Sequence, residues 1–304
     1  MRWRTTTPVV EKVDVADDPV ICGKKSARPV IKAAGGKTRL LPEILPRLPK
    51  EISRYHEPFV GGGAVFFALA AAGRLVDAEI HLADMNAELV NLYEVIRDWP
   101  TKLVKKLRGD ADFVNESDAF YRVRAWDPKE LSPTARAARM LYLNKTTFNG
   151  LYRVNKKGQF NAPFGRYDAP TICDEANILA VSEVLQDANI HHVDFEEVCK
   201  GAKSGDVTYC DPPYLPLSTT SNFTSYTSDG FSLGDHERLR DAMLDMGRRG
   251  VIALLSNCAA PAIRDLYSGK RFKVEEVEAP RAINSDASKR GNVKELLITV
   301  RRSL

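Results

Sequence analysis

The sequence predicts an α/β protein whose parallel sheet is interrupted by a mostly helical insertion. A strand, a glycine-rich turn, a helix and a second strand follow one another over residues 55–83, which is the spacing of one right-handed crossover unit of a parallel sheet. The middle of the chain then reads as helical and basic, and the alternation of strands and helices resumes near Asn189. The 304 residues, of which 44% are apolar, are enough for a sizeable core and exclude a disordered tail or a disulfide-held miniprotein.

Composition indicates neither a membrane-spanning nor a secreted protein. The longest apolar run, residues 64–72, is far shorter than the roughly 20 residues that a membrane-spanning helix needs. The first residues include no apolar stretch typical of a secretory signal. The five cysteines are scattered and form no Cys-x-x-Cys pair, so we expect neither a zinc site nor a disulfide framework. We therefore expect a cytoplasmic protein with no membrane partner and no metal.

The first part of the chain contains an arm followed by the crossover unit. Residues 1–28 show no clear hydrophobic period, and we expect them to form an amino-terminal arm that is either disordered or added to a sheet edge. The unit that follows has four parts in order, namely a strand at 55–60, the turn Gly61-Gly62-Gly63, a helix at 64–72 and a strand at 79–83. Asp84 comes directly after the second strand, and a helix at 88–97 follows it.

The insertion separates the two halves of the sheet. The predicted boundaries place the sheet domain at residues 29–86 and 172–304 and the insertion at residues 87–171. The helical part of the insertion reaches about Asn144, with Ser132 as a helix N-cap and Pro133 at the first helical position. Residues 152–164 resemble a β-hairpin whose turn is Lys157-Gly158.

The remaining strands complete the sheet after the insertion. Because strands and helices alternate again there, we expect these strands to extend the parallel sheet. The expected elements are strands at 189–193, 206–210 and 251–256, a helix at 235–248, and a closing strand pair at 273–277 and 295–300.

The insertion also carries most of the positive charge. The whole chain has 44 basic and 40 acidic residues, a net charge of +4. Eight basic residues but only one acidic residue, Glu130, fall between Lys129 and Arg166, which gives this stretch a net charge of +7. A basic stretch on a nearly neutral protein indicates a surface that faces a polyanion. A solvated helix face followed by a lysine-rich turn explains the same charges equally well.

The glycine turn after the first strand indicates a nucleotide-like ligand. Glycines at a strand-to-helix turn let the backbone approach a ligand closely. Asp84 lies 23 residues beyond Gly61 at the end of the next strand, where an acid can accept hydrogen bonds from both ribose hydroxyls. This pair fits a nicotinamide enzyme and an S-adenosylmethionine enzyme equally, and a glycine turn without a ligand is also common.

Asp211-Pro212-Pro213-Tyr214, which we call the proline corner, follows the apolar strand at 207–210. Two consecutive prolines cannot continue a strand ladder, so the backbone must leave the sheet at its carboxyl edge, where ligands bind in open α/β sheets. The two N–H groups of an exocyclic amine on a planar base can meet Asp211 and the Pro212 carbonyl, while Tyr214 stacks on the ring. The structural alternative is a proline turn capped by an aspartate.

A third segment, residues 32–38, contains Gly35, Gly36 and Lys37. It lacks the spacing of a phosphate-binding loop, and no strand clearly leads into it, so we reject a nucleotide triphosphatase. The Lys37 ammonium could instead neutralise a carboxylate, such as that of a methionine moiety.

Taken in order, these segments resemble the Dam family (D12 class) of DNA adenine-N6 methyltransferases. The matching segments are residues 32–37 (Lys-Trp-Ala-Gly-Gly-Lys motif), 57–67 (Glu-Pro-Phe-x-Gly-x-Gly-x-x-Phe motif), 84–86 (Asp-x-Asn), 143–167 (recognition hairpin) and 211–224 (catalytic loop). The resemblance covers about residues 30–300. It implies a Rossmann-like S-adenosylmethionine-dependent methyltransferase sheet with an inserted helical target-recognition domain that carries a β-hairpin.

The resemblance also implies a role for each matching position. The implied catalytic residues are Asp211, Pro212 and Tyr214. The implied S-adenosylmethionine-binding residues are Ala33, Lys37, Phe59, Gly61, Gly63, Asp84, Phe195 and Asp211. The implied DNA-binding residues are Phe148, Asn149, Leu151, Arg153, Arg166, Ser218 and Asn222. Two positions depart from the family: Ala33 replaces a tryptophan that packs beside the cofactor, and Phe148 replaces a tyrosine and keeps only its ring.

The implied enzyme transfers a methyl group to N6 of an adenine flipped out of double-stranded DNA. Hydrogen bonds from N6 to Asp211 and the Pro212 carbonyl would favour the localised form of its lone pair during attack, without a metal or a covalent intermediate. The preserved Asn149, Leu151 and Arg153 indicate GATC as the recognition sequence. We expect a monomer of prokaryotic or phage type, standing alone or part of a restriction–modification pair.

Three other interpretations stay open at this point. The chain could methylate a different amino group, on cytosine N4, RNA or a protein amide. It could be an NAD-dependent oxidoreductase, which leaves the proline corner and the basic stretch unexplained. It could also be a DNA-binding protein that has lost catalysis, although Lys37, Asp84 and Asp211 are all present.

Overall fold

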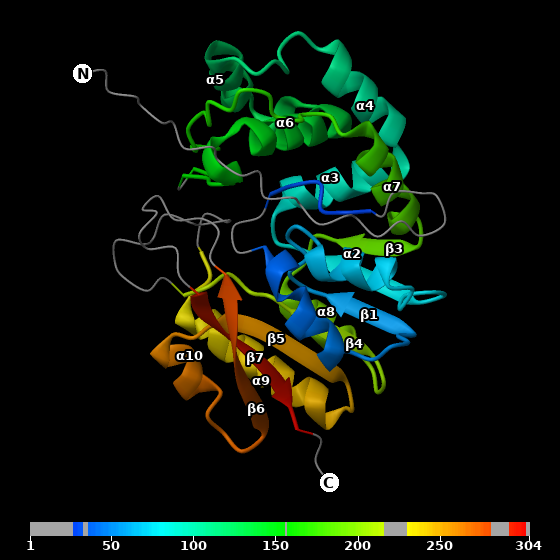
Figure 1. The fold of residues 1–304 in the computed structure, drawn as a ribbon, viewed down its shortest axis with the longest axis vertical. Helices are drawn as coiled ribbons and strands as arrows, with labels where there is room; N and C mark the ends of the chain where they lie inside the picture. Colours follow the sequence, from blue (N-terminus) through cyan, green and yellow to red (C-terminus); the bar gives the residue numbers. More distant parts are fainter. Residues whose placement is uncertain (1–26, 33–35, 156, 216–229, 281–291, 302–304) are drawn as a thin grey trace, which may run out of the picture.

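A seven-stranded sheet carries the fold, in the order β3-β2-β1-β4-β5-β7-β6 (Figure 1). In the computed structural model of the chain, the described residues are 27–32, 36–155, 157–215, 230–280 and 292–301. The strands are β1 (Arg54–Glu57), β2 (Glu79–Ala83), β3 (Ala188–His191), β4 (Val207–Cys210), β5 (Ile252–Cys258), β6 (Phe272–Pro280) and β7 (Asn292–Val300). β1 to β5 are parallel, whereas β7 runs antiparallel between β5 and β6. This architecture confirms the predicted α/β class with a Rossmann-like sheet.

Helices cover both faces of the sheet (Figure 1). They are α1 (Leu41–Ile44), α2 (Ala64–Ala71), α3 (Ala87–Asp98), α4 (Pro100–Gly109), α5 (Ser117–Ala125), α6 (Pro133–Thr146), α7 (Glu175–Leu185), α8 (Phe195–Gly201), α9 (Leu233–Arg248) and α10 (Pro261–Leu266), with short 3-10 helices η1 (Lys37–Leu40), η2 (Leu45–Arg47), η3 (Pro128–Glu130) and η4 (Phe148–Gly150). Side chains alternate between two hydrophobic clusters along β4: Tyr209 joins the cluster that includes α2 and α3, and Cys210 joins the cluster that includes α8, α9 and α10. The sheet is therefore buried on both sides, as parallel sheets are.

The predicted crossover unit matches the structure closely. β2 has the predicted bounds, and α2 is one residue shorter than predicted. β1, however, ends at Glu57 instead of Val60. The strand stops there because Pro58 has no backbone N–H to donate to a neighbouring strand.

The helical insertion packs against the sheet domain without a break in the core. One hydrophobic cluster contains Leu92 of α3, Phe120 of α5 and Leu141 of α6 together with Tyr55 of β1. The Ser132 side chain accepts a hydrogen bond from the Ala135 N–H and caps α6, as predicted. The boundaries at residues 87 and 171 stay a prediction, since packing alone marks no separation there.

The segment 152–164 is not the regular hairpin that the sequence predicts. Its two sides are joined by an isolated bridge between Val154 and Phe160, and a second bridge links Thr147 with Phe164. A continuous ladder is prevented because Pro163 has no N–H, and because the Ala162 carbonyl accepts a hydrogen bond from Arg124 of α5. The turn at Gly158, with φ +75°, agrees with the prediction.

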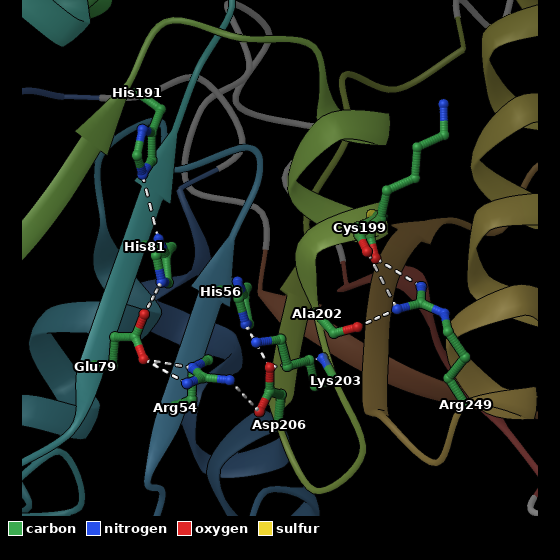
Figure 2. A network of polar contacts seen from close by, with 11 residues as sticks. Arg54, His56, Glu79, His81, His191, Cys199, Ala202, Lys203, Asp206 and Arg249 are labelled. Carbon is green, nitrogen blue, oxygen red and sulfur yellow. Dashed lines mark hydrogen bonds and ion pairs between the residues drawn. The ribbon is translucent and has the colours of Figure 1, made fainter.

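Polar side chains join the amino ends of β1, β2 and β4 (Figure 2). The Arg54 guanidinium donates to Glu79 at 2.7 Å and lies 3.6 Å from Asp206. His56 Nε2 is 2.9 Å from Asp206 Oδ2, and His81 Nε2 is 2.9 Å from Glu79 Oε1. We call these five residues the amino-edge network.

Two absences hold for the described parts of the chain. Every helix in those parts is too short or too polar to span a membrane. No three His, Cys, Asp or Glu side chains there are grouped so that they could hold a metal ion. Cys173, Cys199, Cys210 and Cys258 are free thiols. The expectation of an enzyme without a metal stays a prediction.

Candidate active site and recognition segment

The glycine turn and the proline corner leave the sheet next to each other. β1 pairs in parallel with β4, and the strand order reverses between them. β1 ends at Glu57 and β4 ends at Cys210, so the turn of residues 61–63 and Asp211 follow neighbouring strands at the carboxyl edge. Open α/β sheets bind ligands at such a reversal of strand order.

The glycine turn has a backbone that other residues would not adopt easily. Gly61 and Gly63 have φ values of +48° and +68°, in the left-handed region. A Cβ atom on Gly63 would lie 2.9 Å from a ring carbon of Phe67, closer than atoms can pack. The Tyr93 hydroxyl donates to the Gly61 carbonyl at 2.8 Å and holds the turn from α3. The chain therefore forms a fixed, side-chain-free surface beside the end of β1.

Asp84 is tied to the same turn. The Gly61 N–H donates to Asp84 Oδ2 at 3.1 Å, and the Asn86 N–H donates to Oδ1 at 2.9 Å. Burial raises the pKa of Asp84, while these backbone N–H groups act to lower it. Each carboxylate oxygen accepts one N–H and has a lone pair left for a ligand hydroxyl.

Asp211 is held through one of its two carboxylate oxygens. Oδ1 lies 2.9 Å from the Lys37 ammonium and accepts a hydrogen bond from the Ser256 hydroxyl at 2.9 Å. The Ser256 oxygen is itself 2.8 Å from the Tyr209 hydroxyl, behind it in the core. Among the described residues, no hydrogen bond is made to Oδ2. The carboxylate is therefore oriented by the protein and keeps an acceptor for a ligand.

Tyr214 and Lys37 meet at Glu295, on β7. The Tyr214 hydroxyl donates to Glu295 Oε2 at 2.6 Å, and the Lys37 ammonium lies 3.9 Å from the same oxygen. The ammonium also lies 4.6 Å from the centroid of the Tyr214 ring. Lys37 is only 4% exposed, so its charge serves these two carboxylates inside the protein. Pro212, which directly follows Asp211 in the chain, is buried.

Glu57 lies beneath this site and carries a proton near neutral pH. Burial, together with the nearby Asp211 charge, raises the pKa of Glu57 to about 8. The Tyr55 hydroxyl donates to Glu57 Oε2 at 2.7 Å, and the Phe66 N–H also binds the carboxyl. Burial likewise raises the pKa of Glu295. We call Lys37, Glu57, Asp211, Tyr214 and Glu295 the carboxyl-edge cluster.

Phe59 and Phe195 lie against each other, with ring centroids 5.3 Å apart. Phe195, at the start of α8, is 2% exposed and is also covered by Arg238, whose guanidinium lies 4.9 Å from the ring centroid. Phe59 is half-buried and lies nearer the glycine turn in the chain. Phe195 therefore backs Phe59, which has the more accessible ring.

The predicted recognition segment, residues 143–167, carries an exposed aromatic ring, Phe148, on a tight turn. Phe148 is 46% exposed. Asn149 and Gly150 follow with φ values of +56° and +65°, and a Cβ on Gly150 would lie 2.6 Å from the Lys32 side chain. Asn144 holds this arrangement: its side chain accepts from the Lys32 N–H at 2.7 Å and donates to the Lys32 and Gly150 carbonyls. Lys32, for which we predicted no DNA role, thus packs against the recognition segment.

Arg153 is oriented within the segment. Its guanidinium donates to the Asn161 side chain at 2.8 Å and to the Asn161 carbonyl at 3.1 Å. Leu151 is half-buried, and Arg166 is exposed with φ +52°. Three of the predicted site residues, Ala33, Ser218 and Asn222, lie outside the described residues.

The basic stretch is used partly inside the fold. Arg136 pairs with Glu88 at 2.6 Å. Arg139 is 4% exposed and donates to the Val123 and Arg124 carbonyls. The interpretation of the whole stretch as a surface for a polyanion is therefore too broad for these two arginines.

The structure also brings in residues that motif spacing did not single out. Ser256 and Glu295 both contact the proline corner, although they stand 45 and 81 residues beyond their partners. Their only signal in the sequence is that Ser256-Asn257 and Glu295-Leu296-Leu297 resemble two later segments of the same family. Neither has a spacing that indicates a contact with the corner.

Comparison with known proteins identifies the family. The family model of the D12 class N6 adenine-specific DNA methyltransferases matches residues 34–283. The type II methyltransferase M1.LlaDCHI of Lactococcus lactis subsp. cremoris is 40% identical over 282 residues, which cover 91% of this chain and 96% of that protein. The DNA adenine methylase of Escherichia coli (strain K12) is 36% identical over 274 residues, which cover 90% of this chain and 95% of that protein.

A phage protein extends the similarity. The DNA N-6-adenine-methyltransferase of Escherichia phage P1 is 35% identical over 305 aligned residues, which cover 98% of this chain and 39% of that longer protein. The match thus includes the glycine turn, Asp84, the recognition segment and the proline corner. This chain belongs to the D12 class of N6 adenine-specific DNA methyltransferases.

Proposed function

We propose that this methyltransferase uses S-adenosylmethionine to methylate N6 of an adenine flipped out of double-stranded DNA, with Asp211 accepting a hydrogen bond from that amine. The observation that supports this most is the fixation of Asp211 Oδ1 by Lys37 and Ser256, which leaves Oδ2 as an acceptor. A base inside a duplex cannot reach a buried site, so the target has to leave the stack first.

The proline corner suits an amine that must become a better nucleophile. The N6 lone pair of adenine is delocalised into the ring, which makes the amine weakly reactive. Hydrogen bonds from its two N–H groups to Asp211 Oδ2 and to the Pro212 carbonyl favour the pyramidal, localised form. Positive charge develops on N6 during attack, and the Asp211 carboxylate stabilises it more in the transition state than in the ground state. Tyr214 packs its ring against the flipped base and holds N6 in line.

The glycine turn and its neighbours fit S-adenosylmethionine. This cofactor supplies a methyl group already activated on a sulfonium, so the chain has to bind and orient. Asp84 accepts hydrogen bonds from the ribose hydroxyls, and Gly61 and Gly63 have no side chain that would hold the cofactor away from the backbone. Phe59 is assigned to the cofactor's adenine ring, with Phe195 behind it. Lys37 and Asp211 are assigned to its methionine end. Ala33 is assigned to the position beside the cofactor where the family has a tryptophan.

The recognition segment is assigned to DNA. The exposed Phe148 ring stacks into the space opened in the duplex. Asn149, Leu151 and Arg153 read base edges, and Asn161 holds the Arg153 guanidinium, which is the group assigned to a guanine edge. Phosphate contacts are assigned to Arg166, Ser218 and Asn222. We infer GATC as the recognition sequence from these positions.

Mapping of the product tests the proposal. Unmodified genomic DNA is incubated with the enzyme and S-adenosylmethionine, and modified bases are located by single-molecule sequencing. We expect N6-methyladenine in GATC. Methylated adenine in another sequence would refute the specificity alone, whereas N4-methylcytosine or no incorporated methyl group would refute the proposed reaction.

We also infer that the enzyme acts as a monomer in the cytoplasm, standing alone or beside a restriction enzyme. The four described cysteines are free thiols, as a reducing compartment requires. One chain also provides both the proline corner and the recognition segment. Light scattering on the protein, alone and with a duplex, measures the mass; a dimer in either state would contradict the inference.

A further inference from the structure

We propose that Glu295 is a positioning residue for methyl transfer, which fixes the Tyr214 ring before the target base arrives. This inference rests on the proposed roles of Tyr214 and Asp211. It concerns a residue on β7, far from both in the sequence, whose carboxylate reaches the proline corner from the other side of β5.

The sheet brings Glu295 to the corner. In the register, Glu295 lies opposite Cys258, the last residue of β5, and opposite Val277 of β6. Its neighbours in the strand, Leu296 and Leu297, are buried in the two hydrophobic clusters on opposite faces. The backbone of β7 is thus locked between two strands, and it presents the Glu295 side chain at the carboxyl edge with 12% exposure.

One oxygen of Glu295 contacts both Tyr214 of the proline corner and the Lys37 ammonium. Oε2 accepts the Tyr214 hydroxyl at 2.6 Å and lies 3.9 Å from the Lys37 ammonium. A hydrogen bond from a hydroxyl to a carboxylate is short and strong compared with one between neutral groups. The Tyr214 side chain is therefore anchored at both ends, by the backbone of the corner and by its hydroxyl, with the Lys37 ammonium against its ring.

Fixing the ring in advance matters because stacking helps only when N6 is in line with its methyl donor. A ring free to rotate would have to be ordered as the base binds, at a cost in entropy that the transition state would bear. Glu295 removes that cost in the free enzyme. It has no contact with a reacting atom, so its effect on the rate passes through Tyr214.

Four variants test the coupling: Glu295→Ala, Tyr214→Phe, their double substitution and Glu295→Gln. Tyr214→Phe keeps the ring and removes only the hydroxyl that Glu295 binds. Glu295→Gln keeps an oxygen that can accept this hydroxyl. The matched control is Glu276→Ala, which removes a carboxylate from the same strand pair; Glu276 contacts Arg264 and Lys294, and it has no contact with the corner.

The measurement is the single-turnover rate of methyl transfer, with the DNA dissociation constant and the thermal midpoint recorded for each variant. We expect Glu295→Ala and Tyr214→Phe each to lower the rate about tenfold with DNA affinity within about threefold, and the double variant to lower it by the same tenfold. Glu295→Gln should stay within about threefold of the wild-type rate, and Glu276→Ala should match it.

Two results would overturn the inference. A double variant about a hundredfold slower than wild type would mean that Glu295 acts independently of Tyr214. A Glu295→Ala variant at the wild-type rate would mean that it has no positioning role. If Glu295→Ala does not fold, the test rests on Glu295→Gln and Tyr214→Phe. A Glu295→Gln variant that is much slower than wild type, together with a Tyr214→Phe variant at the wild-type rate, would contradict the coupling. If the wild-type enzyme transfers no methyl group to adenine, the proposed function fails instead, before any variant is compared.

Discussion

The two edges of the sheet both carry clusters of charged side chains, but they balance charge differently. In the amino-edge network, the carboxylates of Glu79 and Asp206 are paired with Arg54 and with histidines (Figure 2). Hydrogen bonds from His81 and Arg54 lower the pKa of Glu79. In the carboxyl-edge cluster, by contrast, the Lys37 ammonium contacts two carboxyl groups, those of Asp211 and Glu295, and burial raises the pKa of both Glu57 and Glu295.

We interpret the amino edge as a structural cluster and the carboxyl edge as the proposed functional one. Partners that satisfy every carboxylate make the amino edge stable and leave little to attract a ligand. Excess acid at the carboxyl edge costs stability, and proteins keep such strain where a ligand or a reaction uses it. The comparison predicts that substitutions at the carboxyl edge change the reaction, whereas those at the amino edge change stability.

Asp211→Ala gives the largest expected effect. It removes the acceptor that orients N6, so methyl transfer should fall by at least about 10²–10³-fold. DNA affinity should remain near the wild-type value, because phosphate contacts supply most of it. Incorporation of labelled methyl groups and a filter-binding assay measure the two quantities. Turnover within tenfold of wild type would place the chemistry elsewhere.

Asp206→Ala is the corresponding change at the amino edge. It removes the partner of the buried His56 and the acceptor of the Lys203 N–H at 2.8 Å. Loss of one member of a buried polar pair should lower the free energy of unfolding by about 3 kcal/mol. Urea unfolding measures this change, and methyl transfer is assayed well below the unfolding midpoint. A variant that is as stable as wild type but slow would reverse the comparison.

Glu57→Gln tests the cost of the unbalanced edge through pH. An unfolded glutamate loses its proton near its ordinary pKa of 4.5, whereas folded Glu57 keeps it up to about pH 8. Between these values the folded state binds more protons, so the free energy of unfolding falls as pH rises, by up to about 1.4 kcal/mol per pH unit. Glutamine has no proton to lose.

The measurement is urea unfolding of both proteins at pH 6 and pH 8. The wild-type enzyme should lose stability between these values relative to Glu57→Gln. Equal losses in the two proteins would show that Glu57 is already ionised in the folded state, and that the carboxyl edge is less strained than its geometry indicates.

The placement of the glycine turn and the proline corner at one edge of the sheet is of the kind that sequence can predict. Each follows a parallel strand, and the carboxyl ends of parallel strands share one edge. The sequence pattern also locates α2, α3 and α9, whereas it does not predict α7 and α8. Arg139 shows the limit of charge counting, because its burial depends on carbonyl groups of α5 that no local pattern reveals.

Strand order and long-range partners could not be predicted in the same way. The apolar run Leu296-Leu297-Ile298 identifies β7 as a strand but contains no information that it lies between β5 and β6. The contact of Glu295 with Tyr214 depends on that order. The column of His56, His81 and His191 likewise depends on three strands being neighbours, with ring centroids 4.9 and 5.5 Å apart.

A substitution in the histidine column gives the smallest expected effect on the free energy of unfolding. The dependence of that free energy on pH is opposite to the one expected from Glu57. Burial and then the neighbouring His81 lower the pKa of His191 below its ordinary 6.5. Below about pH 6.5 the unfolded chain therefore binds more protons than the folded one, and the free energy of unfolding falls as pH falls. His191→Phe keeps a ring beside His81 and cannot titrate. Urea unfolding at pH 7 and pH 5.5 should show that the variant loses less free energy of unfolding than wild type. The difference between the two proteins should be under about 1.4 kcal/mol per pH unit. An equal loss would assign the acid sensitivity to other groups, and slower methyl transfer at pH 7 would show that the histidine column affects the reaction.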